Sequence, residues 1–182
     1  MYRLFGRRPP RTPRGAPLPP CSRIVAADDD HPRAGPMRFW DSSALVPLLL
    51  REPRTAAMAE LLEADPEIAA WWATPVECAS AAARLRHEGT LDIGEEGRVL
   101  DTIDLLRASY HEILAGADLQ RSAMRLLRVH ALRAADALQL AAAVTWAGSS
   151  PFEGAQLVTL DERLAEAATL EGFQVLPRTH PA

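Results

Sequence analysis

The chain has 182 residues, a net charge of −4 at pH 7 and two cysteines, Cys21 and Cys78. Its length suits one domain with a buried core, and two cysteines are too few for a disulfide framework or a cysteine metal site. No run of about 18 apolar residues is present to cross a membrane, so we expect a soluble cytoplasmic protein that does not associate with membranes.

Residues 1–36 differ in composition from the rest of the chain. They hold eight of the 15 prolines and seven arginines against three aspartates, a charge of +4 that leaves −8 for residues 37–182. This composition, without apolar periodicity, predicts a disordered extension ahead of a single domain at 37–182. One hypothesis is that translation starts at Met37, which the intact mass of the native protein would test. The other is a basic tail that contacts RNA or a partner.

From Met37 onward, short apolar runs alternate with segments of helical periodicity. In chain order, the expected elements are a strand at 37–41, helices at 43–50 and 54–63, a strand at 67–73, helices at 74–87 and 94–109, a strand at 111–115, helices at 118–130 and 135–146, a strand at 156–160, a helix that ends at 170 and a strand at 173–176. The alternation predicts a three-layer α/β/α sandwich with a mainly parallel central sheet.

Individual residues predict several helix boundaries. Pro47 is expected near the first turn of its helix, where a missing N–H costs least. Thr74, followed by a proline, predicts a helix start, and Gly89 predicts the end of the same helix. The helix at 94–109 is amphipathic. The residues expected to form its apolar stripe are Val99, Leu100, Ile103, Leu105 and Leu106.

Four acidic residues lie where an apolar segment gives way to a helix start: Asp41, Glu77, Asp136 and Asp161. In a parallel α/β domain such junctions collect at the carboxyl edge of the sheet, where ligands bind. Two unit charges about 4 Å apart repel by roughly 4 kcal/mol at an effective dielectric near 20. If the four side chains converge, a divalent cation is the natural counter-charge.

Three of these residues also have an ordinary structural explanation. Asp41 suits an N-cap, which is worth about 1 kcal/mol. Glu77 follows Thr74 at the spacing of a capping box, in which it would bond to its own helix start, and on the residues alone this explanation is preferred. Asp136 suits the positive end of a helix dipole.

Polar neighbours of the acidic residues have two interpretations each. The hydroxyls of Ser42 and Ser43 could cap the next helix or support a metal-bound water. Thr159 is on the same side of its strand as Asp161, so it could orient a ligand or be an ordinary strand residue. Arg133 could contact a phosphate or a partner, although a solvated arginine is the more common case.

The segments FWDSSAL, ATPVECAS, LRAADALQL and LVTLDERL contain these acidic residues. As a set, they resemble the PIN-domain family of metal-dependent ribonucleases, and in particular the VapC-type toxins of bacterial toxin–antitoxin pairs. The resemblance extends from Met37 to about Pro177. It implies a PIN-like fold, an RNA substrate, a cognate antitoxin that covers the site, and a homodimer.

The resemblance also implies a function for the acidic residues, namely an endoribonuclease that uses Mg²⁺ or Mn²⁺. Asp41, Glu77 and Asp136 would form the primary metal-binding and catalytic cluster, and Asp161, at the family's most variable position, would complete it. A bound cation can lower the pKa of a water and neutralise charge on a phosphodiester. Such chemistry requires no serine, cysteine or histidine nucleophile.

Two other functions compete with this interpretation. A catalytically silent PIN-like regulator that binds RNA or protein would keep the fold without turnover. A metal-dependent phosphatase of an unrelated α/β class would need a second aspartate two residues after Asp41, where the chain has Ser43. The acidic balance of residues 37–182 argues against broad nonspecific adhesion to nucleic acid, although a locally basic rim is compatible with it.

Overall fold

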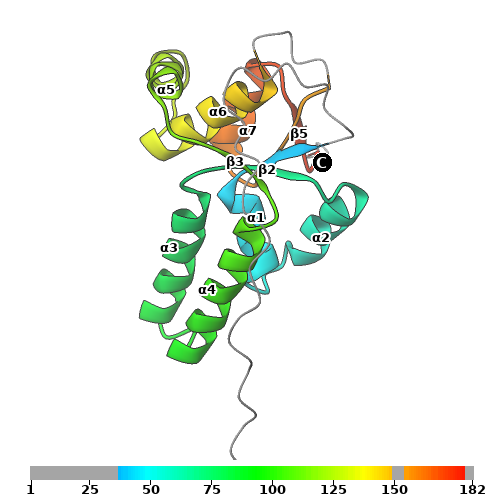
Figure 1. Cartoon of the computed structure of the whole chain (residues 1–182), viewed down its shortest axis with the longest axis vertical. Coiled ribbons are helices and arrows are strands. Elements are labelled where there is room, and N and C mark those ends of the chain that lie inside the picture. Colours follow the sequence, from blue (N-terminus) through cyan, green and yellow to red (C-terminus); the bar gives the residue numbers. More distant parts are fainter. Residues whose placement is uncertain (1–36, 149–153, 179–182) are drawn as a thin grey trace, which may run out of the picture.

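The computed structural model describes residues 37–148 and 154–178, and these ranges contain five strands and seven helices (Figure 1). The strands are β1 (Arg38–Trp40), β2 (Ile68–Trp71), β3 (His111–Ile113), β4 (Gln156–Val158) and β5 (Gln174–Leu176). The helices are α1 (Ser42–Leu49), α2 (Thr55–Ala64), α3 (Thr74–His87), α4 (Ile93–Arg107), α5 (Ala117–Val129), α6 (Ala134–Ala147) and α7 (Glu162–Leu170). The extension predicted at 1–36 lies outside the described residues. None of these helices is long and apolar enough to cross a membrane.

The five strands form one parallel sheet in the order β3-β2-β1-β4-β5. The predicted α/β class with a parallel central sheet is therefore confirmed, although the strands are shorter than the apolar runs that predicted them. The ladder continues one step past β1, because the Asp41 N–H donates to the Val158 carbonyl at 2.9 Å. This bond fixes the point at which the Asp41 side chain leaves the sheet.

Helices cover both faces of the sheet, which explains why the strands are almost wholly apolar. Figure 1 shows α5, α6 and α7 on one side of the sheet and α1 to α4 on the other. Successive residues of a strand point to opposite faces. Phe39 accordingly packs in the core under α5, α6 and α7, whereas Trp40 packs in the core under α1 to α4. The predicted three-layer sandwich is confirmed.

The strand order reverses direction at β1. From β1 the chain adds β2 and then β3 on one side, and later adds β4 and β5 on the other. The carboxyl ends of β1 and β4 therefore flank the topological switch point, which is where open α/β sheets bind ligands. Asp41 directly follows β1, and Asp161 follows β4 by three residues.

A polar cluster at the amino end of β1 fixes its register. The Arg38 Nε donates to the Gln156 Oε1 at 2.7 Å, and its Nη1 donates to the Leu61 carbonyl at 2.5 Å. The same guanidinium forms an ion pair with the buried Asp65, at 3.5 Å. Because this cluster joins β1 to β4 and to α2, it holds the two strands that flank the switch point.

The structure corrects two details of the sequence prediction. Pro47 is the sixth residue of α1, beyond its first turn, since α1 begins at Ser42. The apolar stripe of α4 is narrower than predicted: Val99 and Ile103 are buried, but Leu100 and Leu105 are exposed. Gly89, with φ of +76°, does end α3 as predicted.

Candidate active site

Asp41 is the most deeply buried of the four predicted site residues, with 4% of its surface exposed. Its Oδ2 accepts three hydrogen bonds: from the Ser43 N–H at 3.2 Å, from the Ser43 hydroxyl at 2.5 Å and from the Thr159 hydroxyl at 2.9 Å. Its Oδ1 has only the Ser42 hydroxyl nearby, at 3.5 Å. No arginine or histidine among the described residues forms an ion pair with it. The predicted N-cap role is confirmed, and it uses only one of the two oxygens.

The Asp41 carboxylate lies in a surrounding that opposes its charge. Burial raises the pKa of this carboxyl from 3.8 to about 6; hydrogen bonds from Ser43 and Thr159 partly oppose that rise, and the negative charge of Glu77 adds to it. Asp41 and Glu77 therefore influence each other electrostatically, and neither forms an ion pair with a described arginine or histidine. Such a pair favours a bound cation.

Thr159 and Ser43 connect the exit of β4 to the exit of β1. Their two hydroxyls lie 3.2 Å apart, and the Ser43 hydroxyl also accepts the Leu160 N–H at 2.8 Å. The Thr159 hydroxyl, which donates to Asp41, accepts the N–H of Asp161 at 3.1 Å. Thr159 thus links two of the predicted site residues, Asp41 and Asp161, by hydrogen bonds.

Asp161 is the N-cap of α7. Its Oδ1 accepts the Leu164 N–H at 2.9 Å, and the residue is half-buried. Its Oδ2 has no hydrogen-bond partner within the described part of the chain.

The capping box predicted for Glu77 is wrong. Helix α3 begins at Thr74 with Ala73 as N-cap and has no side-chain cap, because Thr74 is buried within the first turn and its hydroxyl accepts a hydrogen bond from Gln139 at 3.4 Å. The Glu77 Oε2 instead accepts the Gln139 Nε2 at 2.6 Å. Glu77 is therefore directed toward α6, and its Oε1 has no hydrogen-bond partner in 37–148 or 154–178.

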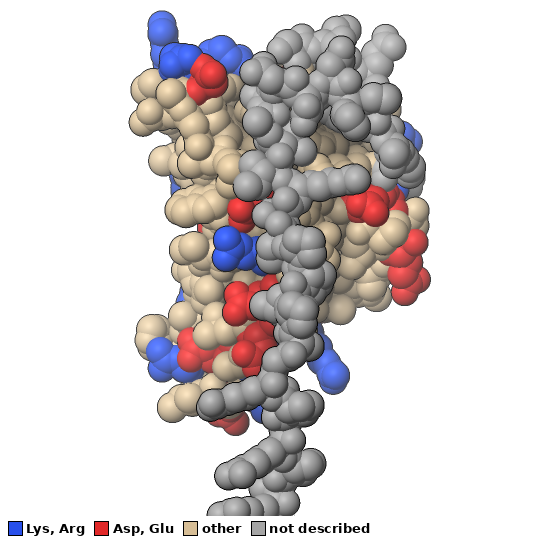
Figure 2. Space-filling view, viewed as in Figure 1, with Lys and Arg blue, Asp and Glu red and all other residues tan. Residues whose placement is uncertain are grey.

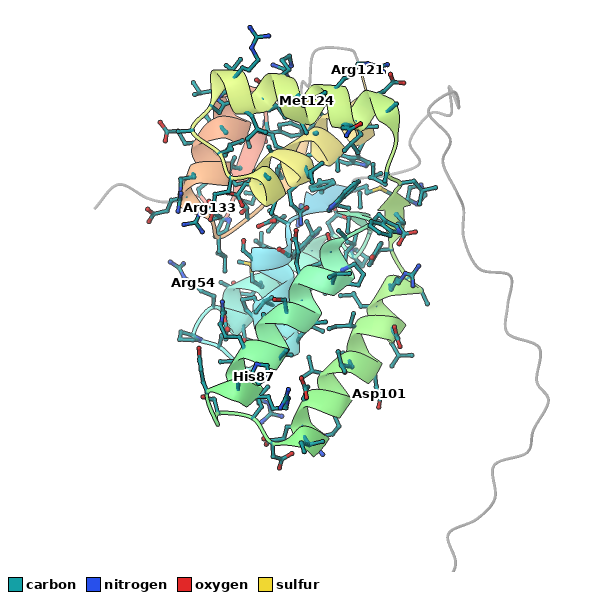
Figure 3. All side chains as sticks on the ribbon, turned by 90° about the vertical axis from the view of Figure 1, so that its left-hand side faces the viewer. Arg54, His87, Asp101, Arg121, Met124 and Arg133 are labelled. Atoms are coloured by element: carbon teal, nitrogen blue, oxygen red, sulfur yellow. The ribbon has the colours of Figure 1, made fainter. Side chains whose placement is uncertain are left out.

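Asp136 occupies the first turn of α6. Its Oδ2 accepts the N–H of Arg133, the residue before that helix, at 3.2 Å. Figure 3 shows Arg133 at the entry to α6. The predicted helix-start role is confirmed, and the Asp136 Oδ1 has no hydrogen-bond partner among the residues that the structure describes. Gln139, the partner of Glu77, lies three residues further along the same helix.

The described contacts join the predicted residues to different extents. Asp41 and Asp161 are linked through Thr159, and Asp41 and Glu77 interact electrostatically. Asp136 is connected to Glu77 indirectly: Asp136 and Gln139 both lie in α6, and Gln139 donates a hydrogen bond to Glu77 of α3. In each of the four side chains, the chain holds one carboxylate oxygen firmly and leaves the other without a close donor.

Comparison with known proteins identifies the family. The model of the PIN domain family matches residues 38–170, which include all four acidic residues. The chain belongs to the PIN domain family. No match was found among curated protein sequences.

Several solved structures share the fold of this chain. A Mycobacterium tuberculosis protein described as VapC20, a sarcin–ricin loop cleaving toxin, matches with a TM-score of 0.56 at 16% identity, over 72% of this chain and 95% of its own. A toxin–antitoxin complex from Klebsiella pneumoniae matches with a TM-score of 0.52 at 18% identity, over 70% and 90%. VapBC2 from Rickettsia felis, bound to a promoter DNA fragment, matches with a TM-score of 0.52 at 14% identity, over 76% and 96%.

The donor set of this PIN domain suits a hard divalent cation held by few protein ligands. No group of three or more Asp, Glu, His or Cys side chains within residues 37–148 and 154–178 is spaced to hold a metal ion. Mg²⁺, however, is usually bound by one or two carboxylates, with waters and substrate phosphate completing its six positions. The buried Asp41 and the neighbouring Glu77 match that smaller requirement.

Cys78, next to Glu77 on α3, is not a candidate nucleophile in this PIN domain. It is buried and unpaired, and burial together with the negative charges of Glu77 and Asp41 raises the pKa of its thiol to about 12. The reactive thiolate is therefore absent at neutral pH.

His87 lies near the end of α3 that is distant from α6 (Figure 3).

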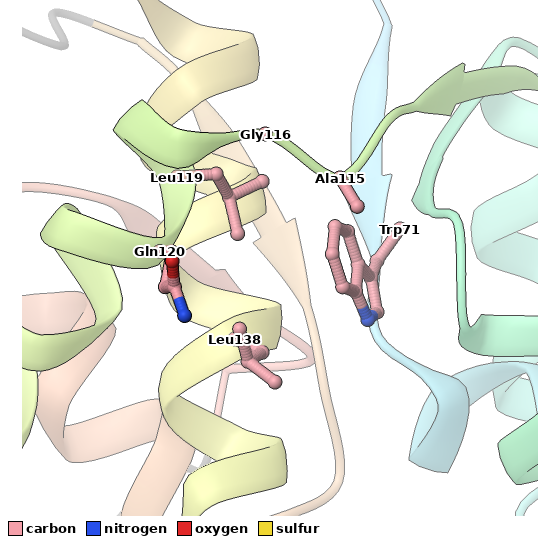
Figure 4. A pocket seen from close by; sticks show the side chains of 6 residues that line it. All are labelled: Trp71, Ala115, Gly116, Leu119, Gln120 and Leu138. Carbon is pink, nitrogen blue, oxygen red and sulfur yellow. The ribbon is translucent and has the colours of Figure 1, made fainter.

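A hollow of about 470 Å³ has no acidic residue in its lining (Figure 4). Its lining residues are Trp71, Ala115, Gly116, Leu119, Gln120 and Leu138. None of them is titratable, so this hollow offers no groups for acid, base or metal chemistry. The chemistry of the PIN domain is more consistent with the acidic residues at the switch point.

The sequence interpretation missed one residue of this site, Gln139. Its amide joins α6 to Glu77 of α3. The available signal was a polar residue among the apolar and alanine residues of its helix, three positions after Asp136. Such a residue is buried on the same helix face as its i−3 neighbour, and buried amides require partners.

Proposed function

We propose that this PIN domain is an endoribonuclease that requires Mg²⁺ or Mn²⁺ and is the toxin of a VapC-type toxin–antitoxin pair. The observation that carries the proposal is common to all four acidic residues. Each carboxylate has one oxygen held by the chain and a second without a close donor, at the carboxyl edge of the sheet. Fixed carboxylates with a free oxygen are suitable ligands for a hard cation.

Each residue of the site would have a distinct role in binding the cation or the substrate. Asp41 and Glu77 would hold the cation, while Ser43 and Thr159 keep the Asp41 Oδ2 occupied and leave its Oδ1 to ligate. The cation, when bound, would lower the pKa of a water and neutralise charge on the phosphodiester. Asp136 and Asp161 would complete the acidic cluster. Arg133, at the entry to α6, would contact a substrate phosphate.

Replacement of Asp136 by asparagine tests the proposal. The change keeps an acceptor for the Arg133 N–H, so folding should survive, but it removes a negative charge from the site. We expect cleavage of total RNA in Mg²⁺ to fall by more than about 100-fold, since changes to residues that only support a metal site already cost 10–100-fold. Cleavage is measured by gel electrophoresis, and circular dichroism checks the fold. Glu162→Gln, an exposed acid in the first turn of α7, is the matched control.

The outcomes separate the proposal from its rivals. Full activity of Asp136→Asn, or activity that survives EDTA, would contradict the metal-dependent nuclease. RNA binding without cleavage by the wild type would identify the silent regulator instead. Release of inorganic phosphate from small phosphomonoesters would favour a phosphatase.

The proposed partners are a cognate antitoxin and a second copy of the chain. The Klebsiella pneumoniae and Rickettsia felis structures with this fold are described as a toxin–antitoxin complex and as VapBC2, which supports an antitoxin partner. Expression of the chain should arrest growth, and co-expression of the antitoxin should relieve the arrest. Light scattering on the purified protein should give the mass of a homodimer.

A further inference from the structure

Gln139 is the buried polar residue of α6, with 2% of its surface exposed. Its buried helix neighbours are apolar, namely Ala137, Leu140, Ala141, Ala142 and Ala143. A buried amide costs free energy unless it is hydrogen-bonded. A leucine at this position would avoid that cost, so packing alone does not explain the glutamine.

The Gln139 amide has a single favourable orientation. Its Nε2 donates to the Glu77 Oε2 at 2.6 Å and lies 3.4 Å from the Thr74 hydroxyl. Only the NH₂ end of the amide can face a carboxylate, because a carbonyl oxygen there would repel it. Hydrogen bonds to a charged acceptor are short and about twice as strong as neutral ones.

The other end of the amide has no partner. The Gln139 Oε1 is buried and accepts no hydrogen bond within the described part of the chain. An unsatisfied buried acceptor costs about 1–3 kcal/mol. The residue thus joins α3 to α6 although one end of its amide stays unsatisfied, which packing alone does not explain.

We propose that Gln139 is a positioning residue for Glu77, and this inference rests on the proposed metal-dependent function. By holding the Glu77 Oε2, Gln139 leaves the Oε1 as the ligating oxygen. It also ties Glu77 to the helix whose first turn carries Asp136, one turn before Gln139. Gln139 itself does not touch the cation or the substrate.

Substitution by leucine separates positioning from packing. Gln139→Leu removes the donor and keeps the side-chain size, so we expect the affinity of the full chain for Mn²⁺, measured by electron paramagnetic resonance, to fall by at least about tenfold. The melting temperature should stay unchanged or rise, because the unpaired Oε1 is removed. Thr74→Val, which removes only the 3.4 Å contact, is the matched control and should change affinity little.

A double-mutant cycle shows whether Gln139 acts through Glu77. In a Glu77→Ala background the leucine substitution should cause no further loss of Mn²⁺ affinity. An equal further loss there, or unchanged affinity in the single variant, would overturn the inference. A melting temperature that falls in parallel with affinity would also overturn it, because packing would then explain the effect.

The hydrogen bond can be checked without metal or activity. In the metal-free protein, the side-chain amide proton of Gln139 should resonate downfield in the NMR spectrum and move upfield in Glu77→Ala; an unmoved signal would overturn the inference. If the wild type binds Mn²⁺ and cleaves RNA but Gln139→Leu behaves like it, only the inference fails. If the wild type neither binds Mn²⁺ nor cleaves RNA, the proposed function is wrong, and the inference about Gln139, which rests on it, is wrong as well.

Discussion

At the scale of single residues, one carboxylate oxygen of each acidic side chain accepts a hydrogen bond and the other has no close donor among the described residues. The Asp41 Oδ2 is fixed by Ser43 and Thr159, the Asp136 Oδ2 by a backbone N–H, and the Asp161 Oδ1 likewise. A capping role therefore does not compete with metal binding for the same atom. The structural and the functional explanations of these residues are compatible, and hydrogen bonding to one oxygen restricts the rotation of the other.

The raised pKa of Asp41 predicts a specific pH dependence of stability. The folded state binds the Asp41 proton more tightly than the unfolded state does. The resulting contribution to the free energy of unfolding is therefore complete below about pH 3.8 and is lost as the pH rises through about 6. The loss is on the order of 3 kcal/mol. Asp41→Asn, which is neutral throughout, should lack this fall. Urea unfolding of both proteins in EDTA, between pH 4 and pH 7, measures the difference.

Two outcomes decide the pH prediction. Parallel pH profiles for the wild type and Asp41→Asn would contradict it. Addition of Mg²⁺ should stabilise the wild type at pH 7.5 more than at pH 5, since a cation favours the ionised carboxylate.

The two serines after Asp41 offer a matched pair. Ser43→Ala removes the 2.5 Å hydrogen bond to Asp41 and leaves the Leu160 N–H without its acceptor, so we expect a loss of about 1–3 kcal/mol of stability and weaker RNA cleavage. Ser42→Ala removes only a 3.5 Å contact and should behave like the wild type. Urea unfolding and cleavage rates check both, and equal effects of the two changes would argue against the ordering role of Ser43.

At the scale of elements, four helices start at the carboxyl edge with an acid at or near their first residue. Asp41 and Asp161 cap α1 and α7, and Glu77 and Asp136 lie in the first turns of α3 and α6. Helix starts carry partial positive charge. Acidic side chains are therefore favoured there even before any cation binds.

The order and type of the elements could be predicted because they follow from local periodicity and boundary residues. The partner of Glu77 could not, because Gln139 lies 62 positions away, and capping rules consider only residues within one turn. The position of Pro47 was mispredicted because the preference of proline for a first turn was applied to a helix in which Pro47 is the sixth residue. The metal-binding roles of Asp41, Glu77, Asp136 and Asp161 stay predictions.

Two glycines test how far local rules explain the stability of α3 and α4. Gly97 lies inside α4, where an added Cβ would meet nothing within 4 Å, so Gly97→Ala should stabilise the protein by about 0.5–1 kcal/mol. Gly89 ends α3 with φ of +76°, so Gly89→Ala should destabilise it by a similar amount or more. Urea unfolding measures both, and a shift of the same sign in the two variants would contradict the argument.

At the scale of the whole molecule, charge is unevenly distributed. Figure 2 shows arginines gathered over α5 and acidic side chains over α4 and α2. Helix α5 carries exposed arginines at three positions that share one face, Arg121, Arg125 and Arg128. From Arg121, helix α5 runs toward its carboxyl end, which precedes Arg133 and the start of α6 (Figure 3). Arg121 forms an ion pair with Asp118 and Arg125 forms one with Glu171, so this basic face is partly neutralised by acidic neighbours.

The α5 surface predicts how the protein meets RNA. In an Asp136→Asn background that prevents cleavage, replacing Arg121, Arg125 and Arg128 by glutamine should weaken RNA binding and reduce the slope of log affinity against log salt by up to about 2, the value for three phosphate contacts. The matched control replaces exposed arginines of α3 and α4: Arg84, Arg98 and Arg107. Binding is followed by fluorescence anisotropy over a salt series. Equal losses in the two triple variants would indicate that only net charge matters.

The register of β1 restricts which insertions and deletions this protein can tolerate. Phe39 and Trp40 fill cores on opposite faces of the sheet, so a slip of the strand by one residue would exchange two rings of different size and also withdraw Asp41 from the edge. Misregistered chains would thus lose packing and chemistry together. An insertion or deletion within 38–41 would therefore have to restore the packing of both cores before any acidic site could work again.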